Sequence, residues 1–138
     1  MKDYFDISME PDQIRAISSI GLAHLGDAVY ELLVRSWLCT HGKATGKGLH
    51  RSAVELVKAS AQAARVERIL PLLTEEELAV YKRGRNAHVH TVPHSASRAD
   101  YLKATALECL FGELYLRGER ERISRLFGCM MEEEEDAT

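Results

Sequence analysis

Apolar residues recur every three or four positions along almost the whole chain between Pro11 and Leu126, which is the spacing of amphipathic helices. No stretch alternates apolar and polar residues for long enough to indicate a strand. Helices are predicted at about 20–39, 49–70, 75–84 and 98–117, with a short helix at Pro11 and an amphipathic one before the C-terminal acidic run. Loops are expected at 41–48 and 85–97. The pattern therefore predicts an all-α chain.

Local signals indicate where several of these helices begin and end. Ser18 and Ser19 are typical N-cap residues for the helix that follows them. Thr74 and Glu77 have the spacing of a capping box, in which each side chain bonds the backbone N–H of the other. Gly118 suits the left-handed residue that commonly follows a helix. We therefore expect side-chain caps at the first two helix ends and a glycine C-terminus at the third.

The chain has 138 residues, of which 46% are hydrophobic and 28% charged, enough for one domain with its own core. We place that domain at residues 1–131 and expect 132–138 to be a disordered acidic tail. No apolar run is long enough to span a bilayer, and the N-terminus lacks the apolar core of a secretory signal. Three cysteines without a CxxC pair do not indicate a disulfide framework, so we expect a reducing, cytoplasmic location.

The net charge of −3 is unevenly distributed along the chain. Acidic residues crowd the N-terminal segment and the run at 132–136, whereas basic residues outnumber acidic ones in between. A mildly basic body is compatible with a nucleic-acid partner, although solvated helix faces produce the same balance.

Three charged residues interrupt the otherwise apolar helix expected at 20–39. Asp27, Glu31 and Arg35 are spaced by four, so they lie on one stripe. Two interpretations stay open: a solvent-facing seam with a Glu31–Arg35 ion pair, or a cleft where Asp27 binds a metal and Glu31 supports it from one turn away. Gly26 favours the second, because a glycine inside a helix costs about 1 kcal/mol relative to alanine and indicates close approach of another group.

A second isolated carboxylate, Glu108, lies in the apolar helix expected at 98–117. Thr105 and Gly112 share its face, so there is room beside it. If the two helices pack together, Asp27 and Glu108 meet, and two carboxylates completed by water and substrate phosphate are typical of Mg²⁺ sites. Spacing alone does not separate this hypothesis from two unrelated helix faces.

Two segments resemble the signature motifs of the ribonuclease III family. Residues 22–29 read LAHLGDAV, where the family usually has LEFLGDAV. Residues 106–116 read ALECLFGELYL, similar to its second motif, and RGRNA at 83–87 lies between them like the family's Gly-Arg element. The sequences LGDAVYE and RGRNA are most similar to the corresponding motifs of the short branch called Mini-ribonuclease III. Members of this branch have one nuclease domain and no double-stranded-RNA-binding domain.

The resemblance implies a helical bundle that forms a homodimer and hydrolyses both strands of duplex RNA with Mg²⁺. It implies catalytic and metal-binding roles for Asp27 and Glu108 alone, because Ala23 and Thr105 stand where the full-length enzymes have two further carboxylates. In the short branch it also implies maturation of 23S ribosomal RNA, with a ribosomal protein that presents the RNA as a candidate partner. The two missing carboxylates leave an alternative, a catalytically silent module that binds RNA or serves as a scaffold.

Contacts with RNA and with a second subunit are expected outside the carboxylate pair. The RNA-binding candidates are Arg83, Arg85, Asn86 and His88 at and after the Gly-Arg element, and Lys43 and Lys47 in the glycine-rich loop. Dimers of the family pack through the signature helix, so the contact candidates are Leu22, His24, Leu25, Val29 and Leu33.

Overall fold

The structure, a computed structural model, describes residues 1–87, 92–94 and 96–136, with side chains up to residue 131. Every regular element in these residues is a helix, as the periodicity predicts, and none of them is long and apolar enough to cross a membrane. The elements are α1 (Pro11–Ile14), α2 (Ser19–Thr40), α3 (Gly46–Val57), α4 (Ala59–Ile69), the 3₁₀ turn η1 (Leu70–Leu72), α5 (Glu75–Arg85), α6 (Arg98–Leu116) and α7 (Arg120–Asp136).

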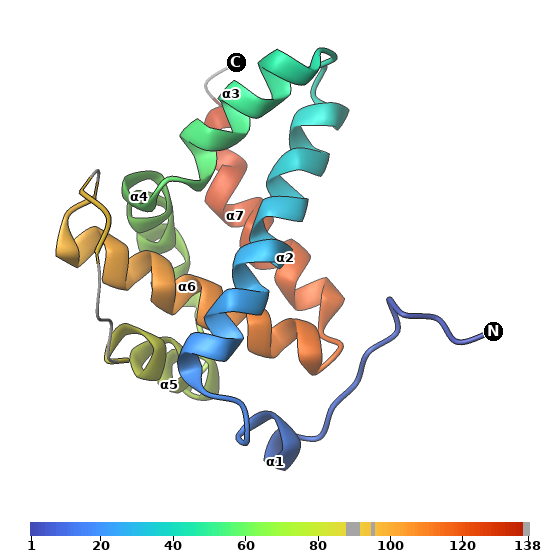
Figure 1. The fold of residues 1–138 in the computed structure, drawn as a ribbon, viewed down its shortest axis with the longest axis vertical. Coiled ribbons are helices and arrows are strands. Elements are labelled where there is room, and N and C mark those ends of the chain that lie inside the picture. Colours follow the sequence, from blue (N-terminus) through green and yellow to red (C-terminus); the bar gives the residue numbers. More distant parts are fainter. Residues whose placement is uncertain (88–91, 95, 137–138) are drawn as a thin grey trace.

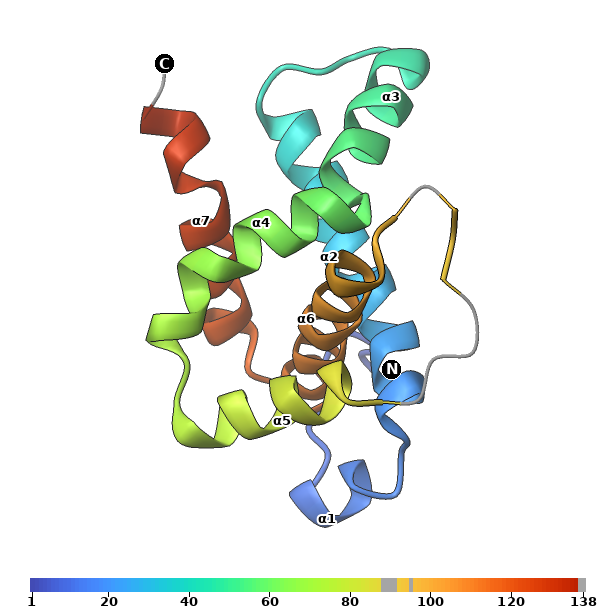
Figure 2. The ribbon, with the colours of Figure 1, turned by 90° about the vertical axis from the view of Figure 1, so that its left-hand side faces the viewer.

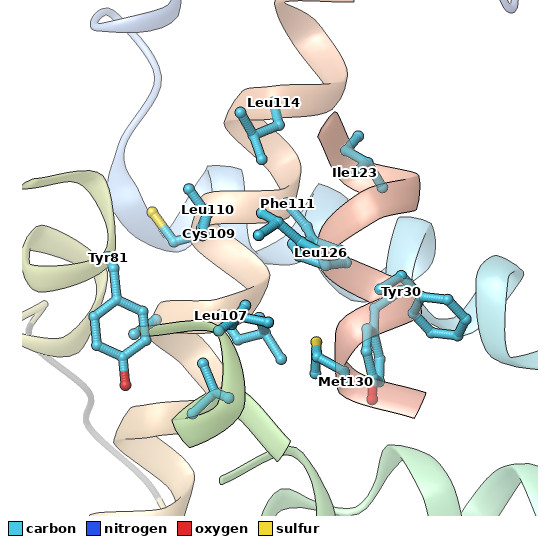
Figure 3. Close-up of a cluster of buried hydrophobic side chains, with 14 of the residues drawn as sticks. Tyr30, Tyr81, Leu107, Cys109, Leu110, Phe111, Leu114, Ile123, Leu126 and Met130 are labelled. Carbon is cyan, nitrogen blue, oxygen red and sulfur yellow. The ribbon is translucent and has the colours of Figure 1, made fainter. Parts of the chain in front are cut away.

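Helix α6 lies at the centre of the bundle, with α2, α4, α5 and α7 packed around it (Figures 1 and 2). Every residue from Ala104 to Leu114 is buried except Glu108. Figure 3 shows part of this core. The ring of Tyr30 from α2 packs edge-to-face on the ring of Phe111 from α6, with 5.9 Å between the ring centroids. A helix that is apolar on nearly all sides must be covered on all of them, which explains its central position.

Two glycines let α2 and α6 cross in direct backbone contact. A side-chain carbon on Gly26 would overlap the carbonyl oxygen of Glu108, and one on Gly112 would overlap the carbonyl oxygen of Leu22. The sequence predicts that Gly26 leaves room for a group beside Asp27, and the group is the backbone of α6. The same contact places Asp27, the next residue of α2, beside Glu108.

The three predicted caps are confirmed. The Ser18 hydroxyl accepts a hydrogen bond from the N–H of Gly21 at 3.0 Å. The N–H of Thr74 donates to the Glu77 carboxylate at 2.9 Å, and the Thr74 hydroxyl accepts from the N–H of Glu77 at 3.1 Å. Gly118 adopts a φ of +78° directly after α6. These bonds satisfy backbone groups that a helix end leaves unpaired.

The single helix expected at 49–70 is wrong, because the chain turns at Lys58 and forms two helices. Lys58 has extended backbone with ψ of 151°. The amide nitrogen of Gln62 donates to the carbonyl of Val57 at 2.7 Å and so caps the end of α3. Helix α3 packs on α2, whereas α4 packs on α6 and α7 (Figure 2). One straight helix could not cover both surfaces, and apolar periodicity does not reveal the bend.

Two further boundaries differ from the predicted ones. Helix α3 begins at Gly46, inside the loop expected at 41–48, because the Thr45 hydroxyl accepts from the N–H of Gly48 at 3.0 Å. Helix α7 runs to Asp136, so the backbone of 132–136 is helical where a disordered tail is expected. Glutamate has a high helix propensity, which favours this continuation. The division of the chain into a domain at 1–131 and a separate tail stays a prediction.

We expect Gly26→Ala to destabilise the protein by about 2 kcal/mol or more, because the added methyl group forces α2 and α6 apart. Gly128→Ala is the matched control, since Gly128 lies in α7 with open space around it and should become more stable by about 0.5–1 kcal/mol. Urea unfolding followed by circular dichroism measures both changes. Equal stability of Gly26→Ala and the parent would show that the crossing is not tightly packed.

Candidate functional site

Asp27 and Glu108 face each other where α2 crosses α6. Their side chains are joined by a hydrogen bond, and this contact favours the protonated form of Glu108 by raising its pKa. Asp27 is exposed, whereas Glu108 is half-buried between the two helices. The structure therefore brings together the two carboxylates that the sequence analysis paired, with one open to solvent and the other deeper in the bundle.

Burial and the neighbouring charge make Glu108 an unusually weak acid. Its pKa is raised to about 8, first by the loss of solvation and then by the negative charge of Asp27. A hydrogen bond from Gln62 acts in the opposite direction and favours the charged form. Two carboxylates in contact without a cation share a proton, because both cannot be ionised at little cost.

Two polar side chains that the sequence analysis did not single out, Gln62 and Tyr30, lie close to the pair. Gln62 of α4 donates to a carboxylate oxygen of Glu108 at 3.4 Å. Tyr30 of α2 is fully buried, and burial raises the pKa of its hydroxyl to about 12, with Arg65 lowering it and Glu108 raising it further. The sequence did hold a signal for Gln62. This polar residue lies four residues before Val66 and seven before Ile69, so it occupies a position on the apolar face of its helix.

The donor set fits one hard divalent cation. In the described residues no group of three or more potential metal-ligating side chains occurs, so Asp27 and Glu108 form a pair rather than a larger cluster. Thr105, one turn before Glu108, is buried, and its hydroxyl donates to the carbonyl of Tyr101 at 2.9 Å. Mg²⁺ commonly takes one or two protein carboxylates and keeps water or phosphate at its other positions. A cation here would replace the shared proton and remove the repulsion between the two charges.

Glu31 is partnered by Arg35 at 3.4 Å, as one of the two interpretations of this stripe predicts. The Glu31 side chain is 38% exposed, so the pair lies at the surface. Surface pairs of this kind contribute a few tenths of a kcal/mol. A supporting role for Glu31 toward Asp27 stays a prediction.

The RNA-binding candidates form two separate groups. Arg83, Arg85 and Asn86 are exposed at the end of α5, where one guanidinium nitrogen of Arg83 lies 4.0 Å from the buried carboxylate of Glu113. His88 lies outside the described residues. The other group, Lys43 and Lys47, is exposed at the turn between α2 and α3, toward the opposite end of the molecule in both views (Figures 1 and 2).

The outer face of α2 carries an apolar groove of about 320 Å³. Its lining includes Leu25, Val29, Leu32 and Leu33 of α2, with Phe5 and Ile123. Leu32, which is 58% exposed, joins these residues in one contiguous apolar surface. Among the predicted dimer contacts, Leu25, Val29 and Leu33 lie in this groove and His24 is exposed. Leu22 is the exception, because it is 6% exposed and packs into the core of its own chain.

Comparison with known proteins identifies the family to which this site belongs. A family model described as the Ribonuclease III domain matches residues 21–119, a span that includes both carboxylates. The chain belongs to the ribonuclease III family. Mini-ribonuclease 3 from Symbiobacterium thermophilum is 48% identical over 105 residues, which cover 76% of this chain and 81% of that one. The protein of the same name from Clostridium tetani is 37% identical over 128 residues, covering 91% and 85%.

A solved structure agrees with this assignment. The crystal structure of a protein from Fusobacterium nucleatum matches with a TM-score of 0.80 and 32% identity, covering 88% of this chain and 98% of that one. The predicted fold class, a ribonuclease III-like helical bundle, is thereby confirmed. The resemblance seen in the sequence is confirmed as well, and this ribonuclease III-family chain is an endoribonuclease of the Mini-ribonuclease 3 branch.

Proposed function

We propose that this endoribonuclease hydrolyses duplex RNA at Asp27 and Glu108, with Mg²⁺ bound between them. The observation that carries the proposal is the contact between an exposed and a half-buried carboxylate from two helices, in which burial and the charge of Asp27 raise the pKa of Glu108. Mg²⁺ bound there would lower the pKa of water and offset charge on a phosphate. A carboxylate pair at the surface, within reach of a long polyanion, favours this chemistry.

Each carboxylate has a different task in this mechanism. Asp27, which is exposed, would hold the cation from the solvent side. Glu108 would hold it from the protein side, for which its carboxyl must be ionised, against the raised pKa that burial gives it. The contact of Gly26 with the backbone of α6 holds the two carboxylates at a constant separation, so that the site needs little rearrangement when RNA binds.

We propose that RNA binds through phosphate contacts with exposed basic residues. Arg83 and Arg85 with Asn86 form the first contact group, and Lys43 with Lys47 the second. Their separation suits a substrate that is long and stiff, as an RNA duplex is. The deep, narrow major groove of such a duplex hides the base edges, so these contacts read charge and shape rather than sequence.

We propose that two copies of the chain associate through the groove on α2. The groove is apolar and open in the single chain, and the exposed Leu32 and the partly exposed Leu25 and Leu33 that line it would be stabilised by being covered. An isologous dimer would place one carboxylate pair in each subunit, which suits a substrate with two strands.

The substrate and setting that the resemblance implies complete the proposal. We propose that the RNA is a precursor of 23S ribosomal RNA, that a ribosomal protein presents it, and that the reaction takes place in the cytoplasm. This choice of substrate rests on the resemblance of LGDAVYE and RGRNA to the Mini-ribonuclease III branch.

We expect Asp27→Asn and Glu108→Gln each to reduce cleavage of labelled duplex RNA at least about 100-fold, because each removes a charged ligand at constant volume. Glu108→Gln should keep or raise the thermal midpoint at neutral pH, since a carboxyl with a pKa raised to about 8 opposes folding when it ionises. Glu55→Gln, an exposed carboxylate on α3, is the control and should cleave normally. Normal cleavage by Asp27→Asn in Mg²⁺ would refute the assignment.

We expect the double variant Arg83→Ala, Arg85→Ala to bind all duplex RNAs more weakly and to reduce the salt dependence of binding. The slope of log K against log salt should fall by about one for each lost phosphate contact. Filter binding in Ca²⁺ at several salt concentrations measures the slope, with Arg125→Ala on α7 as an exposed control. An effect on one RNA sequence only would indicate base recognition instead.

We expect the parent to have twice the 15.5 kDa mass of the chain in light scattering, and Leu32→Glu to shift it to the single-chain mass. The charge would enter the groove but leave the core of the chain intact, because Leu32 is exposed. Val54→Glu introduces the same charge at an exposed site of α3 outside the groove lining and should not change the mass. A dimer that survives Leu32→Glu would place the interface elsewhere.

A further inference from the structure

Gln62 is a buried amide that connects two parts of the fold to the carboxylate pair. Its side chain lies in α4 and the residue is 2% exposed. Its nitrogen donates to the carbonyl of Val57 at the end of α3, at 2.7 Å, and to an oxygen of Glu108 at 3.4 Å. One NH₂ group therefore joins the bend between α3 and α4 to the deeper carboxylate of the site.

The orientation of this amide follows from its partners. The carbonyl of Val57 can only accept a hydrogen bond, so the side-chain atom that faces it must be the nitrogen. The amide oxygen consequently points elsewhere, and it is buried without a hydrogen-bond partner among the described residues. An unsatisfied buried acceptor is unfavourable and uncommon in folded proteins.

A purely structural role accounts for only half of this arrangement. Capping the Val57 carbonyl explains the first hydrogen bond, but a cap needs neither the bond to Glu108 nor a buried acceptor beside the site. A group that orients a metal ligand requires the bond to Glu108, because outer hydrogen bonds determine which carboxylate oxygen is free to bind.

We propose that Gln62 is a positioning residue for the metal site formed by Asp27 and Glu108. Its NH₂ group holds one oxygen of Glu108 and so leaves the other free to bind the cation. This inference rests on the proposed function, because it assumes a cation between the two carboxylates. Gln62 itself is buried and does not touch RNA, so it acts through Glu108.

The test compares Gln62→Met with Val66→Ala. Methionine keeps the length and approximate volume of glutamine but forms neither hydrogen bond. Val66, fully buried one turn further along α4, is the matched control, because its truncation also destabilises the helix but leaves Glu108 and Gln62 joined. Binding of Mn²⁺ is measured by isothermal titration calorimetry without RNA, and cleavage of duplex RNA is measured over a range of Mg²⁺ concentrations.

We expect Gln62→Met to bind Mn²⁺ about 10- to 100-fold more weakly than the parent and to need correspondingly more Mg²⁺ for half-maximal cleavage. At a fixed low Mg²⁺ concentration its kcat should fall while KM for RNA stays unchanged. Val66→Ala should match the parent in both metal titrations. If Gln62→Met instead binds Mn²⁺ like the parent, or its activity falls only with its folded fraction, Gln62 is a structural cap and the proposal is wrong.

Two further variants keep the result decisive. If Gln62→Met does not fold at the assay temperature, Gln62→Asn replaces it, because its shorter amide cannot reach both Val57 and Glu108 and should also weaken Mn²⁺ binding. Parental Mn²⁺ affinity in a folded Gln62→Asn would overturn the proposal.

The variant Asp27→Asn distinguishes a failure of this inference from a failure of the proposed function. If Asp27→Asn loses Mn²⁺ while Gln62→Met retains it, only the positioning role fails, whereas parental binding by Asp27→Asn would overturn the metal site itself.

Discussion

The backbone contact between α2 and α6 is the constraint on which the rest of the structure depends. The backbone carbonyl of Glu108 packs against Gly26, and that of Leu22 packs against Gly112, so there is no space for a side chain at either position. Because the two helices approach so closely, their flanking side chains are forced to the edges of the crossing. Asp27 and Glu108 meet at one of these edges. The residues that pack the bundle and the residues that form the site are thus neighbours in the chain.

This arrangement creates a binding site but lowers the stability of the fold. A half-buried carboxyl next to a second carboxylate resists ionisation, as the pKa of Glu108, raised to about 8, indicates. The rest of α6 compensates, since its other central residues are buried among α2, α4, α5 and α7. A cation between Asp27 and Glu108 would convert the repulsion into attraction. The amide of Gln62 already favours the charged form of Glu108 from the opposite side.

Features that depend on interactions between residues close in the chain were predictable from the sequence. Helical periodicity gives the fold class, and short-range signals give the caps at Ser18 and Thr74 and the end at Gly118, because these depend on hydrogen bonds within a few residues. The bend at Lys58 was not predictable, since it depends on which surfaces α3 and α4 cover. The inward position of Leu22, expected at a dimer contact, depends on the same kind of long-range packing.

The sequence by itself determined that the chain is all-α, that it carries two isolated carboxylates beside mid-helix glycines, and that its motifs resemble ribonuclease III. Only the tertiary structure decided that Asp27 and Glu108 touch, that the glycines face the opposite helix, and that Gln62 lies against the pair. The physical reason is the range of the interactions. Helix formation and capping act between residues a few positions apart, whereas the site joins α2, α4 and α6, whose contacts arise only when the helices pack.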